Sequence, residues 1–208
     1  MNFVQQNKKY TKTELELAKE CLEKGAILYS GVKGWSMFPW INYSDKILIK
    51  KIPTEEIKVG DIIVVHYGEE EMFIGHRVIR IQQEIKGKSF LTKGDFVFFI
   101  DELVEEEKVI GKVREIIKKN GLKIDLENKR VKIFSYLTAK YSFAVAICIS
   151  LLKRVCLISY FPLIIGKIGE IITIIPWVII FGIYNMYSKI SSKKLPYPTL
   201  LKNKREIL

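Results

Sequence analysis

The sequence predicts a mainly β protein: an antiparallel β domain, with one helix before it and a hydrophobic helical region after it. Three observations lead to this prediction. Short β-rich runs broken by Gly, Pro, Asn and Asp follow one another from Ala26 to about Asp125, without helical segments between them. The first 24 residues instead carry apolar side chains at helical spacing. After Lys132, long uncharged runs replace the mixed pattern.

These patterns divide the chain into four regions. Residues 1–24 are predicted to form an amphipathic helix that ends near Glu23, because Gly25 is a natural helix stop. The other predicted regions are a β-rich domain over 25–128, a hydrophobic helical region over 129–190 and a basic tail over 191–208.

Six strands are expected in the β-rich domain. The segment Lys46–Lys50 alternates polar and apolar residues, which is typical of a half-buried strand. The run that follows Asp61 is continuously apolar and indicates an interior strand. The predicted strands are Ala26–Val32, Lys46–Ile52, Asp61–Tyr67, Met72–Gln82, Ser89–Thr92 and Val109–Ile117.

The positive charge is concentrated in the C-terminal third. The whole chain has a formal net charge of +11, and residues 131–208 hold 11 of its 34 basic and 2 of its 23 acidic residues. A basic, apolar segment favours an anionic membrane surface over nucleic acid. The first 130 residues contain no zinc-finger spacing and no RNA-binding motif. We therefore expect a lipid membrane, and no nucleic acid, as a partner.

The cysteines indicate neither a disulfide framework nor a metal site. Cys21, Cys148 and Cys156 are odd in number and form no CxxC motif. The last two lie in hydrophobic runs, where a buried thiol behaves as a small apolar group. We expect no cofactor and no metal.

Residue types suited to hydroxyl-based catalysis occur in a suggestive order. Ser36 lies in Gly34-Trp-Ser-Met-Phe-Pro39, and His76 follows forty residues later in Gly75-His-Arg-Val78. Thr92-Lys-Gly-Asp95 comes next, and Asp101 is six residues further on. A serine, a histidine and an aspartate can act as a nucleophile, its base and the residue that orients the base. Without the other motifs, Ser36 would be interpreted as a turn serine.

These motifs resemble those of the signal peptidase I family, S24/S26-type serine peptidases that cut leader peptides at membranes. The resemblance covers about residues 25 to 115 and rests on Ser36-Met-x-Pro39, Gly60-Asp61 with its apolar run, Gly75-His76-Arg77-Val78 and Lys93-Gly94-Asp95. A histidine before Arg-Val is similar to the archaeal and endoplasmic-reticulum branch. The resemblance implies Ser36 as nucleophile and His76 as general base. Asp101 and Asp95 are the candidates to orient that base, and we favour Asp101, with Asp95 shaping the site.

Two features bear on this assignment. Many bacterial members have a hydroxyl residue two positions before the nucleophile, whereas this chain has Gly34. The oxyanion hole is then expected to rely on backbone N–H groups, including that of Ser36, and on a further donor that the sequence does not identify. The alternative bases are Lys86, Lys88 and Lys93, which we expect in solvated loops. The second histidine, His66, ends an apolar strand and is expected to be structural or exposed.

The C-terminal third predicts membrane association. Its uncharged runs are Tyr141–Leu152, Val155–Gly166 and Ile171–Tyr187. Lys153-Arg154 interrupts the sequence between the first run and the second. A helix that crosses a membrane needs about 20 apolar residues. Of the three runs, only the last one by itself approaches this length. The basic tail is expected on the cytoplasmic side. In the absence of an N-terminal targeting signal we favour the same side for the β domain, with two spans or interfacial helices.

The sequence thus predicts a membrane-associated serine endopeptidase that removes the leader or signal segment of a precursor. One alternative is a catalytically inactive membrane scaffold that keeps the fold and binds peptides by strand addition. The other is a self-cleaving Ser-Lys peptidase.

Overall fold

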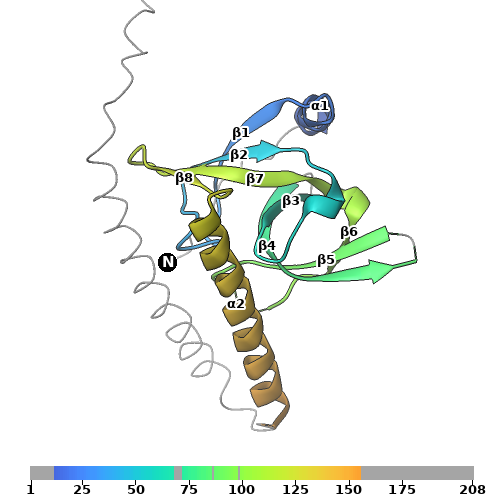
Figure 1. Cartoon of the computed structure of the whole chain (residues 1–208), viewed down its shortest axis with the longest axis vertical. Helices are drawn as coiled ribbons and strands as arrows, with labels where there is room; N and C mark the ends of the chain where they lie inside the picture. The colour runs from blue at the N-terminus through green and yellow to red at the C-terminus, as the bar shows by residue number, and fades with distance from the viewer. Residues whose placement is uncertain (1–11, 68–71, 86, 98, 156–208) are drawn as a thin grey trace, which may run out of the picture.

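The computed structural model describes residues 12–67, 72–85, 87–97 and 99–155 (Figure 1). Antiparallel strands form the body of the protein, with α1 (Lys12–Glu23) before them and α2 (Lys129–Val155) after them. This arrangement confirms the predicted fold class. The later predicted runs, Val155–Gly166 beyond its first residue and Ile171–Tyr187, lie outside the described residues, as does the basic tail.

The strands form one sheet of eight, in the order β1-β2-β7-β3-β4-β5-β6, with β8 paired to β7. Two short 3₁₀ helices, η1 (Thr54–Glu56) and η2 (Glu106–Lys108), connect strands. The strands are β1 (Ile27–Gly31), β2 (Lys46–Lys50), β3 (Ile62–Tyr67), β4 (Met72–Glu84), β5 (Gly87–Lys93), β6 (Leu103–Glu105), β7 (Val109–Ile117) and β8 (Lys123–Asp125). Sequence patterns missed β6 and β8, because three residues are too few to show an alternation.

The central strand β3 explains why its sequence is continuously apolar. Ile62 and Val64 belong to one hydrophobic cluster, whereas Ile63 and Val65 belong to a second cluster. Because successive side chains of a strand point to opposite faces, β3 is covered on both sides. Burial of each such side chain stabilises the fold by about 1.5–3 kcal/mol.

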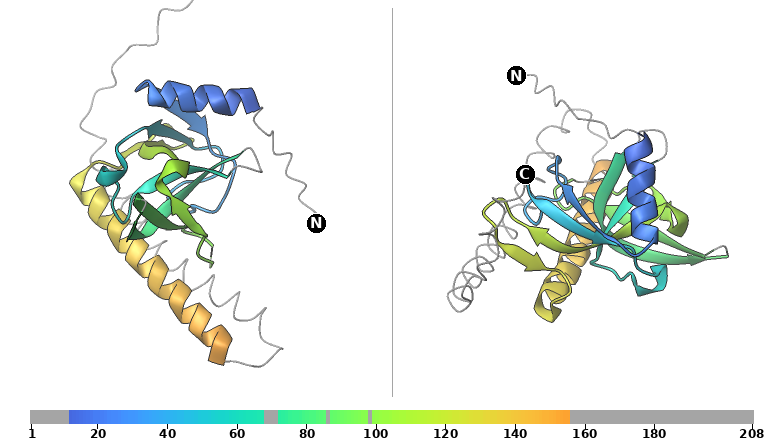
Figure 2. Two further views of the ribbon diagram at one scale, coloured as in Figure 1. Left: turned by 90° about the vertical axis from the view of Figure 1, so that its right-hand side faces the viewer. Right: turned by 90° about the horizontal axis from the view of Figure 1, so that it is seen from above.

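The two helices contact different parts of the sheet (Figure 2). α1 lies against β1 and β7, and its Leu22 is buried in the first cluster. It ends at Glu23, and Gly25 just beyond it has a φ of +83°, the left-handed conformation that glycine adopts without a Cβ clash. α2 lies against β4 with its N-terminal half and extends beyond the sheet with its C-terminal half (Figures 1 and 2).

Two expectations about the C-terminal region need correction. The helix α2 continues through Lys153-Arg154, so these charges do not interrupt it. Cys148 is exposed on α2 and not buried among apolar side chains. Among the described residues, one helical segment, Lys129–Leu151, is long and apolar enough to cross a membrane by length and composition, with a mean hydropathy of 1.4.

Candidate active site

Ser36 and His76, forty residues apart in the chain, meet on one face of the sheet. Ser36 lies in the turn that follows β1, where Phe38 N–H donates to Trp35 C=O and Ile41 N–H to Met37 C=O. His76 lies on β4, paired with Ile63 of the central strand. The Nε2 atom of His76 is 3.0 Å from Oγ of Ser36.

Asp101 completes a series of three side chains. Its Oδ2 lies 2.6 Å from Nδ1 of His76, and each of the two side chains is only 12% exposed. A carboxylate can only accept a hydrogen bond, so Nδ1 carries the proton and donates it. The Nε2 atom is then the acceptor for the Ser36 hydroxyl. This tautomer is the one that a general base requires.

Thr92 holds the carboxylate of Asp101, a role that the sequence analysis did not assign. Its buried hydroxyl donates to Asp101 Oδ2 over 2.7 Å. The backbone reinforces this contact, because Asp101 N–H donates to Thr92 C=O over 3.0 Å. Thr92 was visible in the sequence only as the residue before Lys93-Gly-Asp95.

Asp95 lies behind the site and pairs with Arg77, the residue that follows His76. Nε of Arg77 donates to Oδ1 of Asp95 over 2.8 Å, and Nη2 donates to Oδ2 over 2.7 Å. Both side chains are buried, and the guanidinium also lies 5.1 Å from the ring centroid of Trp40. The structure therefore pairs Asp95 with Arg77, and it pairs Asp101 with His76.

The Lys93-Gly-Asp95 segment touches the backbone of Ser36. Phe96 N–H donates to Ser36 C=O over 2.8 Å. A Cβ atom at Gly94 would lie 2.8 Å from that carbonyl oxygen and 3.0 Å from Cβ of Ser36. Only glycine leaves room for this approach.

Lys93 corrects the expectation that the alternative lysines occupy solvated loops. Its side chain is buried, and Nζ donates to Ser142 Oγ over 2.7 Å and to Gly94 C=O over 3.0 Å. Burial lowers the pKa of Lys93 to about 8, although the charges of Asp95 and Asp101 raise it in part. Within the described chain, Lys93 forms no hydrogen bond with Ser36. Lys88 is half-buried on β5, and Lys86 lies outside the described residues.

A buried ion pair supports the loop that carries Ser36. Nζ of Lys118 donates to Trp40 C=O over 2.7 Å and to Asp45 Oδ2 over 2.9 Å. Burial lowers the pKa of Lys118, and the hydrogen bond to Asp45 partly offsets this effect. Asp45 also accepts a hydrogen bond from Asn42 N–H. These contacts tie the second half of the loop to the residue that follows β7.

Aromatic side chains form an exposed surface next to Ser36. Trp35 stacks on Tyr43 with a centroid distance of 6.2 Å, and both side chains are 51% exposed. Phe38 packs edge-on against Phe96 at 5.5 Å. Met37 and Trp40, by contrast, belong to the first hydrophobic cluster.

Other candidate groups lie apart from this series. His66 is half-buried on β3, where Nδ1 lies 3.2 Å from Nζ of Lys19. In the described part of the chain, no cluster of three or more His, Cys, Asp or Glu side chains could hold a metal ion.

A comparison with known families matches residues 2–113, which include Ser36, His76, Asp95 and Asp101, to the Peptidase S24-like model. The matched segment covers more than half of the chain and extends from α1 through most of β7. Its fold and residue chemistry agree with a serine-type peptidase. The chain belongs to the Peptidase S24-like family.

Proposed function

We propose that this protein is a membrane-associated serine endopeptidase that removes the leader or signal segment of a precursor, as signal peptidases of the histidine-base branch do. The observation that carries the proposal is the continuous series of hydrogen bonds from Ser36 through His76 to Asp101. A serine hydroxyl beside an oriented imidazole is an arrangement that activates oxygen as a nucleophile.

In the proposed mechanism, Ser36 Oγ attacks the carbonyl carbon of the scissile peptide bond while its proton passes to His76 Nε2. Asp101 stabilises the imidazolium that forms. His76 then protonates the leaving amine as the C–N bond breaks, which leaves an ester on Ser36. A water molecule attacks this ester after giving its proton to His76, and the free acid leaves as the proton returns to Ser36.

The negative charge that develops on the carbonyl oxygen needs hydrogen-bond donors. The backbone N–H of Ser36 donates no hydrogen bond to another described residue, so it is available for this role. Gly34 offers no side-chain donor, and nothing lies within 4 Å of the position that its Cβ would occupy. The proposed oxyanion site therefore depends on backbone donors.

An extended peptide is the substrate that suits this geometry. β1 is the terminal strand of the sheet, and its chain leads within five residues to Ser36. A peptide that pairs with the free edge of β1 would extend toward Ser36. The exposed aromatic rings of Trp35 and Tyr43 would offer apolar contacts beside the scissile bond.

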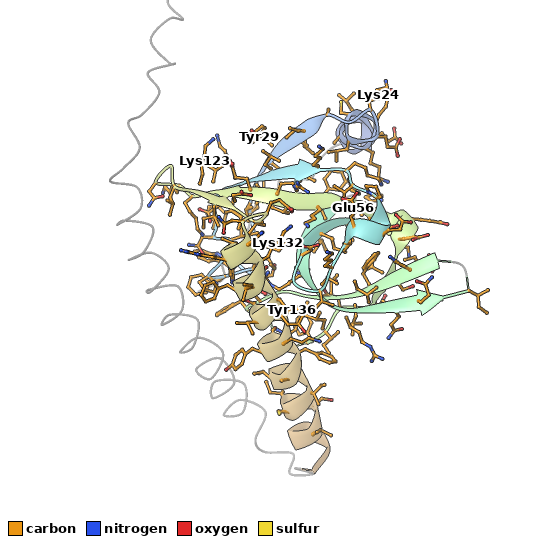
Figure 3. The ribbon with its side chains drawn as sticks, viewed as in Figure 1. Lys24, Tyr29, Glu56, Lys123, Lys132 and Tyr136 are labelled. Carbon is orange, nitrogen blue, oxygen red and sulfur yellow. The ribbon has the colours of Figure 1, made fainter. Side chains whose placement is uncertain are left out.

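The proposed membrane contact is the outer face of α2. This helix has six basic and no acidic residues. Only 28% of an 18-residue apolar stretch within Lys129–Leu151 is buried. Figure 3 shows Lys132 and Tyr136 on successive turns of α2. Because the opposite face packs on the β domain, we favour a helix that lies in the membrane interface over one that lipid surrounds on all sides.

In this proposal α2 and the tail lie on the cytoplasmic side, and the basic character of both segments supports this orientation. The β domain, which is docked on α2, would lie on the same side. Cosedimentation of the full chain with vesicles that contain anionic lipid tests the membrane contact, and binding should weaken as salt is raised. Equal binding to neutral vesicles at high salt would argue against a basic interfacial helix.

The peptidase proposal can be tested before a substrate is known. The full-length protein is incubated with a proteome-derived peptide library, and new peptide ends are identified by mass spectrometry. We expect internal cleavages with the wild type and none with Ser36→Ala. Binding of library peptides without cleavage by either protein would favour the inactive scaffold.

A Ser-Lys peptidase is the second candidate, because Lys93 is buried with its pKa lowered to about 8. Its ammonium group, however, is directed to Ser142 and Gly94 C=O. His76 is the titratable group that contacts Ser36 Oγ. The contacts therefore favour the histidine as base.

A further inference from the structure

α2 turns small and hydroxyl-bearing side chains toward the β domain. Its buried residues recur every three or four positions and are Val131, Ser135, Thr138, Ala139, Ser142 and Ala146. Six large side chains of the helix are exposed instead, and they are Ile133, Phe134, Tyr136, Leu137, Ile147 and Leu151. Apolar burial by Val131, Ala139 and Ala146 is therefore joined by polar contacts, of which two stand out.

The first contact is made by Ser135. Its Oγ donates to Gly60 C=O over 2.7 Å and accepts a hydrogen bond from Nη1 of Arg77. Gly60 allows the helix to come this close, because a Cβ there would lie 2.8 Å from the backbone nitrogen of Tyr136. Arg77 directly follows His76 on β4, so this contact ends one residue from the proposed base.

The second contact, two helical turns later, is made by Ser142. Its Oγ accepts a hydrogen bond from Nζ of Lys93 over 2.7 Å, and the same ammonium group donates to Gly94 C=O. Gly94 packs against Ser36, whose carbonyl accepts from Phe96 N–H. This contact therefore ends beside the backbone of the proposed nucleophile.

We propose that Ser135 and Ser142 are positioning residues. Through them, α2 fixes the distance between β4, which carries His76, and the Lys93–Asp95 turn, which packs against Ser36. This distance keeps His76 within hydrogen-bonding reach of Ser36. This inference rests on the proposed peptidase function. Neither hydroxyl touches a reacting atom, so one acts through Arg77 and the other through Lys93. Both serines lie outside the segment that the family model matches, residues 2–113.

The physical reason lies in the two buried cations that the serines contact. If a hydroxyl is removed, one buried N–H of Arg77 or Lys93 loses its acceptor, while Arg77 Nη1 keeps Gly60 C=O and Lys93 Nζ keeps Gly94 C=O. A shift of the side chain and its backbone is then expected as the lost contact is replaced. A displacement of about 1 Å in a catalytic group can lower the rate about 100-fold. The loss should appear in kcat, because neither serine lies where substrate would bind.

The test compares the full-length wild type with Ser135→Ala, Ser142→Ala and the double variant. Ser150→Ala is the matched control, since Ser150 is exposed on the same helix. With a peptide chosen from the library screen, we expect kcat of the double variant to fall about 10- to 100-fold, while KM stays within about two-fold. Ser150→Ala should match the wild type.

Histidine NMR supplies a second readout that needs no substrate. The chain has two histidines, and a His66→Gln variant assigns the imidazole signals. We expect the His76 ring signals to shift in the double variant and to stay in place in Ser150→Ala. A double variant that melts earlier, but keeps both kcat and the His76 signals while folded, would overturn the positioning role.

The two proposals fail in different ways. If the wild type cleaves no library peptide, the peptidase proposal is wrong, and the His76 signals alone then decide the positioning role. If the double variant does not fold, the single variants decide, since each keeps one of the two contacts. A single variant with unchanged kcat and unchanged His76 signals would remove that serine from the proposal.

Discussion

The buried lysine of the site makes stability depend on pH in a defined direction. Burial lowers the pKa of Lys93 from 10.5 to about 8, the charges of Asp95 and Asp101 oppose this, and the charge of Arg77 adds to it. Between these two pH values the unfolded chain carries a proton on Lys93 that the folded protein has lost. The free energy of unfolding therefore contains a Lys93 contribution that increases from pH 8 to 10.5.

The size of this contribution follows from the two pKa values. Each pKa unit corresponds to about 1.4 kcal/mol, so the full window is worth about 3 kcal/mol. Lys93→Met removes the titration and keeps a side chain of similar length. We expect the free energy of unfolding of the wild type, relative to Lys93→Met, to increase by most of this amount between pH 7 and 10.

Urea unfolding at a series of pH values, followed by tryptophan fluorescence, measures this difference. Leu91→Met is the matched control, because it changes a half-buried side chain on the same strand and removes no titratable group. Its pH dependence should run parallel to that of the wild type. The difference in free energy of unfolding between the wild type and Lys93→Met should increase with pH. If this difference stays constant or decreases with pH, the assignment of a buried lysine with a lowered pKa is refuted.

Four further predictions concern the site and its support. Asp101→Asn should lower kcat by about 10⁴-fold, because the amide no longer selects the required imidazole tautomer. Thr92→Val, which removes one hydrogen bond to Asp101, should lower it by about 10-fold; equal kcat in both variants and the wild type would exclude Asp101 as the orienting residue. Asp95→Asn leaves Arg77 buried without its countercharge and should reduce the free energy of unfolding by about 3–5 kcal/mol in urea titrations, whereas a loss below about 1 kcal/mol would contradict a buried ion pair. Gly34→Ser places a hydroxyl in open space two residues before Ser36 and should raise kcat by up to about 100-fold by adding an oxyanion donor. Gly34→Ala is its control, and an equal effect of both variants would show that the hydroxyl does not contribute.

The fold was predictable because most strands are long enough to show their pattern. The alternation in β2 and the double-sided burial of β3 were both visible in the sequence. The short strands β6 and β8 were not, since each contributes one buried residue, Val104 or Ile124. The length of α2 was also missed, because an uncharged run of the sequence ends at Lys153-Arg154. A helix with one exposed face accommodates such charges without a break.

The candidate site was predictable as a set of residues, but its internal geometry was not. Spacing alone left Asp95 and Asp101 as alternatives for the partner of His76. The choice depends on Thr92, whose hydroxyl and carbonyl hold Asp101, and on Arg77, which pairs with Asp95. Such contacts across strands follow from sheet register, and the local sequence does not display register.

Lys93 shows most clearly what a local pattern cannot reveal. Its neighbours Thr92, Gly94 and Asp95 indicate a polar turn, and a lysine there would ordinarily be solvated. In the structure its ammonium group contacts Ser142 of α2, 49 residues later in the chain. The burial, and with it the lowered pKa, is therefore a consequence of tertiary packing.

The most direct test of the central claim compares His76→Ala with Lys93→Met in cleavage of a library-derived peptide at neutral pH. If His76 is the base for Ser36, His76→Ala should lose about 10⁴-fold or more in kcat. Lys93→Met should stay within about 10-fold of the wild type, because it disturbs only the support of the site. The opposite pattern, with Lys93→Met inactive and His76→Ala active, would contradict the account and identify the lysine as the base.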